Sequence, residues 1–290
     1  MDGDRETKRP RTYSNNNSNS NSKQQAKNAP QNKGAEEDAA NMSASKKAVV
    51  DSFKSYRDTL DLHHDQRERV IKCSRDITAL SKKIVFSLLR ITQDGPTRVF
   101  DEAERKHKQV LELFAKISAD LQGTDASKYN RQATPGIQEY IEAIGLWVFL
   151  RDNKLITMQQ VVERLTPEGA SAPLVDVTDS DYVLGICDLP GEVNRYCINS
   201  IGKGDREAVK RCVAFLRVMK EGVALLLCSG KIKDLDKKSE VLDSSLSKTE
   251  AAYYSMCIRE GETGSMDVDA PTTTGGSNSS SSNQATVGVA

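Results

Sequence analysis

The sequence predicts an all-α protein with one helical bundle domain over residues 44–260. Apolar residues recur at spacings of three and four through this range, and runs that alternate apolar and polar residues, as strands do, are absent from it. Pro and Gly stand at separated positions, where they punctuate helices. No repeat of fixed period is visible, so a solenoid is not expected.

The first predicted helix is unusually long. Ser43 or Ser45 can cap it, and spaced apolar residues continue from Val49 to Ile91, before Asp94-Gly95-Pro96 ends it. A stripe of this length cannot be buried within a compact monomer, so the sequence favours antiparallel packing in a bundle or pairing across a subunit interface. A second helix is expected over residues 97–121, before Gly123.

The later helices are separated by polar and Pro-containing segments. We expect residues 125–136, DASKYNRQATPG, to lead into a helix that has Pro135 in its first turn and IQEYIEAIGLWVFL as its body. A short helix is expected at about 158–165, followed by the loop TPEGASAP. The remaining helices are predicted at about 178–201, 204–228 and 234–258.

Both ends of the chain differ in composition from the predicted domain. Residues 14–22 are all Ser or Asn, and the last thirty residues contain TTTGGSNSSSSNQ. Such segments bury too little apolar surface to offset the entropy of ordering them, so residues 1–43 and 261–290 are predicted to be disordered tails. The basic tract at Lys8, Arg9 and Arg11 is either a nuclear localisation signal or an unspecific solvated tail.

Charge, cysteine content and hydropathy exclude several classes of protein. The 41 basic residues balance 41 acidic ones, so the predicted domain has no overall positive field to attract nucleic acid. The six cysteines form no CxxC pair and only three histidines are present, which argues against a zinc site. We expect an intracellular protein with reduced, packed thiols and no membrane span, because neither a long apolar stretch nor an apolar leader occurs.

Two pairs of acidic residues are candidates for a metal site. Glu139 and Glu142 lie about 60° apart on a predicted helix that is otherwise largely apolar. Asp188 and Glu192 are four positions apart, so they are expected to stack on one face of the 178–201 helix. Two carboxylates 4 Å apart repel by about 4 kcal/mol at an effective dielectric near 20, so a site that joins all four needs a cation.

The chemistry of these acids restricts the ion. Ligands that are all oxygen favour Mg²⁺ or Mn²⁺ over zinc or iron. A di-iron carboxylate site is excluded because it needs Glu-x-x-His pairs and no histidine follows His107. Acidic pairs at this spacing are also common on ordinary helices, and the spacing alone does not show that the two helices face each other.

Three blocks of sequence carry a specific resemblance. RERVIKCSRDITALSKKIVFSLLRI, GIQEYIEAIGLWVF and DYVLGICDLPGEVNRYCINSIGKGD resemble the translin superfamily, and the similarity runs over most of residues 46–259. The four acids of the superfamily's nuclease subunit match Glu139, Glu142, Asp188 and Glu192 one for one. Translin itself lacks this set, so the resemblance assigns the chain to the catalytic type of subunit that pairs with translin.

The resemblance implies a seven-helix fold, assembly with translin into a closed and usually octameric shell, and acidic sites that face its interior. It also implies a Mg²⁺-dependent endoribonuclease that acts on single-stranded RNA, in which the four acids are both the metal ligands and the catalytic residues. Removal of small-RNA passenger strands, processing of transfer-RNA fragments, binding of single-stranded DNA, and a nuclear and cytoplasmic location are implied in the same way.

Basic residues near the acids are candidate RNA contacts. Arg195 follows Glu192 by one turn, and either contacts phosphate or pairs with the acids. The long first helix carries a basic run that is either an RNA contact or a solvated face, formed by Lys72, Arg75, Lys82, Lys83 and Arg90.

Pro190 departs from the superfamily pattern, which has Thr there, and is expected to kink the helix between Asp188 and Glu192. Such a kink either disturbs the metal geometry or is absorbed next to Gly191. The alternative function is therefore a non-catalytic helical partner that stabilises translin and assists its binding to single-stranded nucleic acid.

Overall fold

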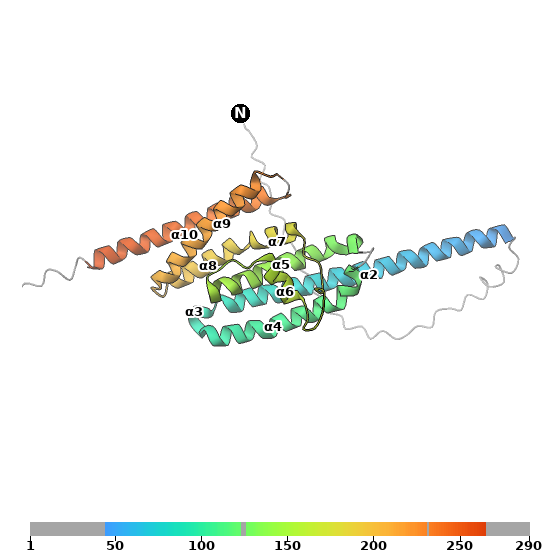
Figure 1. Ribbon diagram of the computed structural model, residues 1–290, viewed down its shortest axis with the longest axis horizontal. Coiled ribbons are helices and arrows are strands. Elements are labelled where there is room, and N and C mark those ends of the chain that lie inside the picture. Colours follow the sequence, from blue (N-terminus) through green and yellow to red (C-terminus); the bar gives the residue numbers. More distant parts are fainter. Residues whose placement is uncertain (1–43, 123–125, 231, 265–290) are drawn as a thin grey trace, which may run out of the picture. The chain divides into compact units, whose positions relative to one another are not determined.

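The computed structural model describes residues 44–122, 126–230 and 232–264. These residues form helices and no strand, which confirms the all-α prediction (Figure 1). The segments are α2 (Ala44–Leu88), α3 (Ile91–Asp94), α4 (Pro96–Ile117), η1 (Ser118–Leu121, a 3₁₀ helix), α5 (Ala126–Asp152), α6 (Met158–Leu165), α7 (Asp179–Ile186), α8 (Leu189–Ile201), α9 (Arg206–Leu227) and α10 (Leu235–Gly264).

The described residues bear on two features considered in the sequence, membrane-spanning helices and the packing of the thiols. None of the described helices combines the length and apolar character needed to cross a membrane. All six cysteines are free thiols, and four of them are buried, as the packing interpretation predicts. The tail predicted for residues 1–43, with its basic tract, lies outside the described residues, as do residues 265–290 of the second predicted tail.

Helix α2 belongs to two units of the chain, which divide between Asp58 and Thr59. In the first unit, the helix exposes Val49, Phe53 and Tyr56, and the rings of Phe53 and Tyr56 lie edge to face with centroids 6.5 Å apart. In the second unit, the buried face of α2 begins at Val70 and contributes to the core.

The long first helix ends earlier than the predicted stop at Asp94-Gly95-Pro96. α2 stops at Leu88 and the single turn α3 follows. Gly95, at φ 82, then allows the chain to enter α4 with Pro96 in its first turn. Glycine adopts this left-handed backbone conformation without the steric cost that other residues pay.

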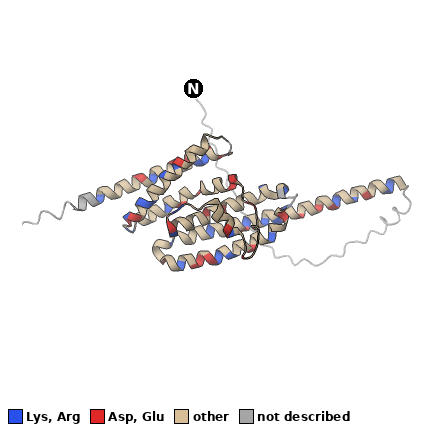
Figure 2. Cartoon of the chain, viewed as in Figure 1, with Lys and Arg blue, Asp and Glu red and all other residues tan. Residues whose placement is uncertain are grey.

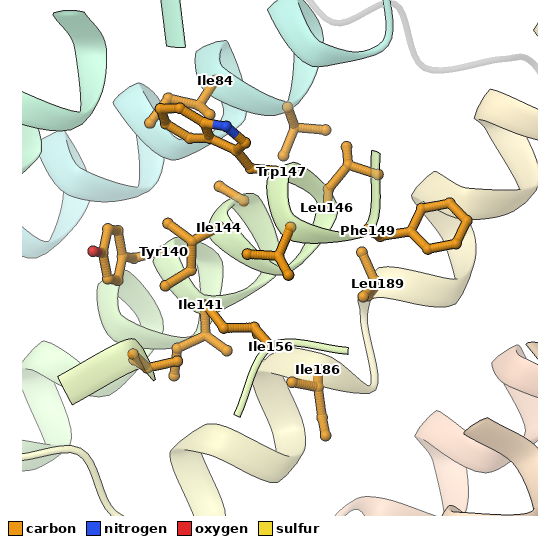
Figure 3. Close-up of a cluster of buried hydrophobic side chains, with 14 of the residues drawn as sticks. Ile84, Tyr140, Ile141, Ile144, Leu146, Trp147, Phe149, Ile156, Ile186 and Leu189 are labelled. Atoms are coloured by element: carbon orange, nitrogen blue, oxygen red, sulfur yellow. The ribbon is translucent and has the colours of Figure 1, made fainter. Parts of the chain in front are cut away.

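Helix α5 forms the centre of the core in the second unit. Tyr140, Ile141, Ile144 and Leu146 are fully buried. Figure 3 shows Trp147 of α5 beside Ile84 of α2, while Ile186 and Leu189 lie against another side of α5. Since burial of each large apolar side chain contributes about 1.5–3 kcal/mol, this cluster fixes the position of α5 and of the acids that it carries.

The predicted start of α5 is wrong, because the helix begins about ten residues earlier. Tyr129 and Ala133 are buried and stand eight and four positions before Ile137, so they extend the apolar stripe of α5 toward its N-terminus. Pro135 consequently lies inside the helix. The carbonyl that loses its hydrogen bond is that of Arg131, an exposed residue, which lowers the cost of the proline there.

The single helix predicted over residues 178–201 is also wrong, because the structure has two helices there. α7 ends at Ile186, and α8 begins at Leu189 with Pro190 in its first turn. Proline lacks the N–H that would bond the carbonyl of Ile186, and the first turn of a helix needs no such bond. The chain therefore breaks at Cys187 and Asp188, so the helix is interrupted and not kinked.

Two glycines allow neighbouring helices to approach α5 closely. A β-carbon added to Gly185 of α7 would lie 2.8 Å from the β-carbon of Ile141 and 2.9 Å from the carbonyl oxygen of Gln138. One added to Gly136 of α5 would lie 3.0 Å from the carbonyl oxygen of Ser74 in α2. Both crossings lie next to the segment of α5 that carries Glu139 and Glu142.

The last two helices complete this unit. α10 packs against both α8 and α9. Two ion pairs join α9 to α10: Arg217 Nη2 lies 2.8 Å from Glu250 Oε1, and Lys220 Nζ lies 2.7 Å from Asp243 Oδ1. Figure 2 shows the positions of basic and acidic residues mixed along the described helices, which agrees with the balanced composition.

Candidate metal centre

The four predicted acids come from two neighbouring parts of the fold. Glu139 and Glu142 lie on α5, Asp188 is the N-cap residue of α8, and Glu192 lies in the first turn of α8. All four side chains are partly buried. The packing of α7 and α8 on α5 brings these acids into one cluster, which the spacing of each pair could not establish.

The electrostatic coupling between the four acids is seen at Glu142. Burial, followed by the negative charges of Asp188, Glu139 and Glu192, raises the pKa of Glu142 to about 8. Burial also raises the pKa of Glu192, where Arg195 opposes the shift and Glu139 adds to it. Each carboxylate is thus close enough to influence the ionisation of another, as expected when several acids share one site.

Two lysines from other helices lie against the cluster. Lys82 Nζ of α2 is 3.1 Å from Glu139 Oε1, and Lys238 of α10 donates a hydrogen bond to Asp188 Oδ1. The hydrogen bond to Glu139, together with the charges of Glu139, Glu142 and Asp188, raises the pKa of Lys82. Glu139 and Asp188 therefore each have a cationic partner.

The other two acids are less well satisfied. Arg195 Nη1 lies 3.1 Å from Glu192 Oε2, yet this buried oxygen accepts no hydrogen bond. The carboxylate of Glu142 makes neither an ion pair nor a hydrogen bond with any described residue. Buried oxygen atoms without a donor are costly, so this part of the cluster favours an additional cation.

The donor set fits Mg²⁺ or Mn²⁺ by its chemistry, because all of its ligating atoms are carboxylate oxygens. No three Asp, Glu, His or Cys side chains in the described ranges converge closely enough to hold an ion in this arrangement. Glu139 and Asp188 instead contact Lys82 and Lys238. Ligation by all four acids would use the second oxygen of each of these carboxylates or displace the lysine from the first.

The predicted relation between Asp188 and Glu192 is wrong in its detail. The two residues do not stack on one continuous helix, because Asp188 lies in the break before α8. At the N-cap position, Asp188 makes no side-chain capping bond, and its carboxylate contacts Lys238 instead. Pro190 occupies a position that accepts proline, so no strained kink separates the two acids.

The residues predicted to contact RNA differ in their distance from the acid cluster. Arg195 pairs with Glu192, which was one of its two expected roles. Lys72 and Arg75 are exposed on α2, ten and seven positions before Lys82, or roughly 15 and 10 Å along the helix axis. Among the contacts of the described residues, neither of them reaches the four acids.

The contact of Lys238 with the acid cluster was not predicted from the sequence. Lys238 follows Lys237 near the start of an amphipathic helix, and Lys237 pairs with Asp234 on the protein surface. Only the packing of α10 against α8 distinguishes the two lysines. By contrast, the basic run of the first helix already included Lys82.

Comparisons with known proteins identify the family. Residues 65–260 match the model of the translin family. Translin-associated protein X of Rattus norvegicus is 35% identical over 238 residues, which cover 76% of this chain and 82% of that protein. The translin-associated protein X homolog of Schizosaccharomyces pombe is 28% identical (78% and 96% covered), and translin of Homo sapiens is 21% identical (73% and 94% covered).

Solved structures share the fold. The crystal structure of apo-NeC3PO has a TM-score of 0.57 at 19% identity and covers 70% of this chain and 96% of that chain. The structure of AfC3PO in complex with duplex RNA has a TM-score of 0.54 at 21% identity, with 72% and 97% covered. These likenesses show the fold, and the sequence matches show that the chain belongs to the translin family.

Proposed function

We propose that the chain is the catalytic subunit of a divalent-cation-dependent endoribonuclease that acts on single-stranded RNA in a hetero-oligomer with translin. The observation that carries this proposal is the cluster of four acids from α5 and α8. In this cluster, the negative charges of the other three acids help to raise the pKa of Glu142. Similarity to translin-associated protein X supports the choice of partner. The RNA complex of a protein with the same fold supports RNA as the ligand.

Glu139, Glu142, Asp188 and Glu192 would hold Mg²⁺ or Mn²⁺. When bound, the ion supplies charge neutralisation at phosphate oxygens and acidifies bound water. The carboxylates orient the attacking water, and Glu139 or Glu142 accepts its proton. No side chain forms a covalent bond to the substrate. The buried face of α5 below the acids holds both glutamates on a rigid element, which favours a fixed geometry for hydrolysis.

Cleavage by the complex co-purified with translin tests the proposal. Labelled single-stranded RNA is incubated with wild type, Glu142→Gln and Asp188→Asn, each in Mg²⁺ and in chelator. We expect the wild type to cut only with Mg²⁺, and each variant to lose roughly a hundredfold or more in rate. Glu221→Gln, an exposed position on α9, is the matched control and retains the rate of the wild type. Equal cleavage by wild type and Glu142→Gln contradicts the proposal.

One observation favours the alternative of a non-catalytic partner that stabilises translin and assists its binding to single-stranded nucleic acid. Lys82 and Lys238 satisfy Glu139 and Asp188 without any metal ion, as a structural acid cluster requires. Under this alternative, both acid variants leave RNA decay unchanged, and Asp188→Asn, which weakens the pairing with Lys238, lowers the melting temperature of the complex. The two functions are therefore separated by the same set of variants.

The proposal extends to the assembly and its setting. We propose a closed, octameric shell with translin, in which the acidic clusters face the interior, and which also binds single-stranded DNA. Passenger strands of small RNAs and transfer-RNA fragments are the proposed substrates, in nucleus and cytoplasm. Native mass spectrometry of the co-purified complex gives the subunit count, and removal of the basic tract at Lys8, Arg9 and Arg11 tests nuclear entry.

A further inference from the structure

Lys82 and Lys238 contact the acid cluster from two different helices. Lys82 extends from α2 to Glu139, and Lys238 extends from α10 to Asp188. Lys82 also acts electrostatically on Glu142 and Asp188, and Lys238 acts on Glu142. Both ammonium groups are therefore close to the space where a cation held by the four carboxylates would lie.

A divalent cation bound by the four acids competes with these two ion pairs. It draws on the carboxylates of Glu139 and Asp188, and in each of them one oxygen contacts a lysine. An ammonium group that stayed beside a divalent ion would also be repelled by it. This repulsion favours displacement of both lysines from the carboxylates when the cation binds.

The displaced lysines remain tethered beside the site. The Lys82 side chain is 64% exposed, so its flexible stem has room to swing away from Glu139. The Lys238 side chain is 25% exposed, which confines its ammonium group near Asp188. Two displaced positive charges at the rim of a metal centre are placed to attract phosphate groups of a nucleic acid strand that runs across it.

We propose that Lys82 and Lys238 have two successive partners: the carboxylates of Glu139 and Asp188 before the cation binds, and phosphate groups of the RNA strand after it has bound. Both lysines are positioning residues for the substrate. This inference rests on the proposed function, because it takes the four acids as the cation site. It predicts that the lysines contribute to RNA binding only when a divalent cation is present.

The test measures RNA affinity of the translin complex with and without a cation. Fluorescence anisotropy of labelled single-stranded RNA is recorded in Ca²⁺, with gel analysis to verify that the RNA stays intact, and in chelator. The variants are Lys82→Met and Lys238→Met, which remove the charge and keep the length of the stem. Two exposed lysines that contact none of the four acids supply the controls, Lys108→Met on α4 and Lys237→Met on α10.

In Ca²⁺, each of Lys82→Met and Lys238→Met is expected to weaken RNA binding about fivefold to tenfold, and to reduce the slope of log affinity against log salt by about 0.7. In chelator, both variants bind RNA as the wild type does. The two control variants match the wild type under both conditions. Lys82→Arg, which keeps the charge, restores most of the affinity in Ca²⁺.

A second measurement follows the cation itself. Titration with Mn²⁺ is expected to show tighter binding by Lys82→Met and Lys238→Met than by wild type, because a competing positive charge has been removed from the carboxylates. Lys108→Met and Lys237→Met leave Mn²⁺ affinity unchanged. This readout does not depend on cleavage.

Two results would overturn the inference. Unchanged RNA affinity of both lysine variants in Ca²⁺ means that the lysines are counter-ions of the acids alone. An equal loss of affinity in Ca²⁺ and in chelator means that they contact RNA permanently, without release by the cation. If the wild type cuts RNA with Mg²⁺ and either result is found, only the inference fails; if the wild type does not cut at all, the proposed function fails first.

Discussion

A β-carbon placed on Gly185 would lie only 2.8 Å from the β-carbon of Ile141, so α7 and α5 cross at the closest approach that their backbones allow. Asp188 follows Gly185 by three residues, and Glu142 is the next residue after Ile141. This crossing therefore sets the separation between the acids of α8 and those of α5.

Gly185→Ala is expected to lower the melting temperature of the translin complex, since a methyl group at this point also meets the carbonyl oxygen of Gln138 at 2.9 Å. Relief of such overpacking costs about 1–3 kcal/mol. Gly222→Ala on α9 is the control, because a β-carbon there has no atom within 4 Å, and its melting temperature should equal or exceed that of the wild type. Equal melting temperatures of Gly185→Ala and Gly222→Ala would show that the crossing tolerates a methyl group.

The stability of the cation-free complex is expected to depend on pH through Glu142. The pKa of Glu142 is raised to about 8 in the folded protein from 4.5, so the folded state holds this proton while the unfolded chain loses it. The contribution of Glu142 is fully present below about pH 4.5 and is lost as pH rises toward 8. In chelator, the difference in melting temperature between Glu142→Gln and wild type should therefore grow over this interval in favour of the variant. If the melting temperatures of wild type and Glu142→Gln change with pH in parallel, the raised pKa of Glu142 is contradicted.

A buried pair of rings in the core gives a second pH effect of opposite sign. His107 Nε2 lies 2.9 Å from the Tyr140 hydroxyl, and burial lowers the pKa of His107 below 6.5. Stability is therefore lost as pH falls from about 6.5 toward the lower pKa of the folded state, because only the unfolded chain takes up this proton readily. An NMR titration of the His107 ring should give a midpoint below 6.5.

Tyr140→Phe leaves the buried nitrogen of His107 without its partner and should cost about 1–3 kcal/mol of stability, seen as a lower melting temperature. Tyr254→Phe, at an exposed position on α10, is the control and should melt as the wild type does. If Tyr140→Phe melts at the wild-type temperature, the hydrogen bond to His107 makes no net contribution to stability.

Exposed apolar residues in the first unit predict that the solubility of the chain depends on a partner. Val49, Phe53 and Tyr56 are exposed at spacings of four and three along residues 44–58, which forms an apolar stripe that water solvates poorly. We expect the chain expressed alone to aggregate or be degraded, and co-expression with translin to yield soluble protein. Light scattering from the purified chain distinguishes the outcomes, and a well-behaved monomer would be the contrary result.

The residues themselves predicted the helical class and most helix ends, because apolar spacing and Gly-Pro signals are local. The start of α5 was missed because polar residues around Tyr129 and Ala133 concealed a stripe that is buried only in the folded protein. Pro190 marked the correct place for a disturbance, but a kink and a complete break leave the same local pattern.

Spacing alone yielded two acidic pairs, and their union into one set came from the resemblance to the translin superfamily. The contact of Lys238 with Asp188 joins residues 50 positions apart, so no local pattern encodes it. Tertiary packing of α10 on α8 is the information that the sequence pattern lacks.

Electron paramagnetic resonance of Mn²⁺ shows whether the four carboxylates bind a divalent cation, without any assay of cleavage. Mn²⁺ is titrated into the translin complex that carries wild type or Glu142→Gln, at equal assembly, and the free ion is measured by its sharp signal. We predict that the wild type depletes free Mn²⁺ in proportion to the concentration of this chain, and that Glu142→Gln loses this binding. Equal depletion by the two complexes, or none by either, would contradict a metal centre formed by Glu139, Glu142, Asp188 and Glu192.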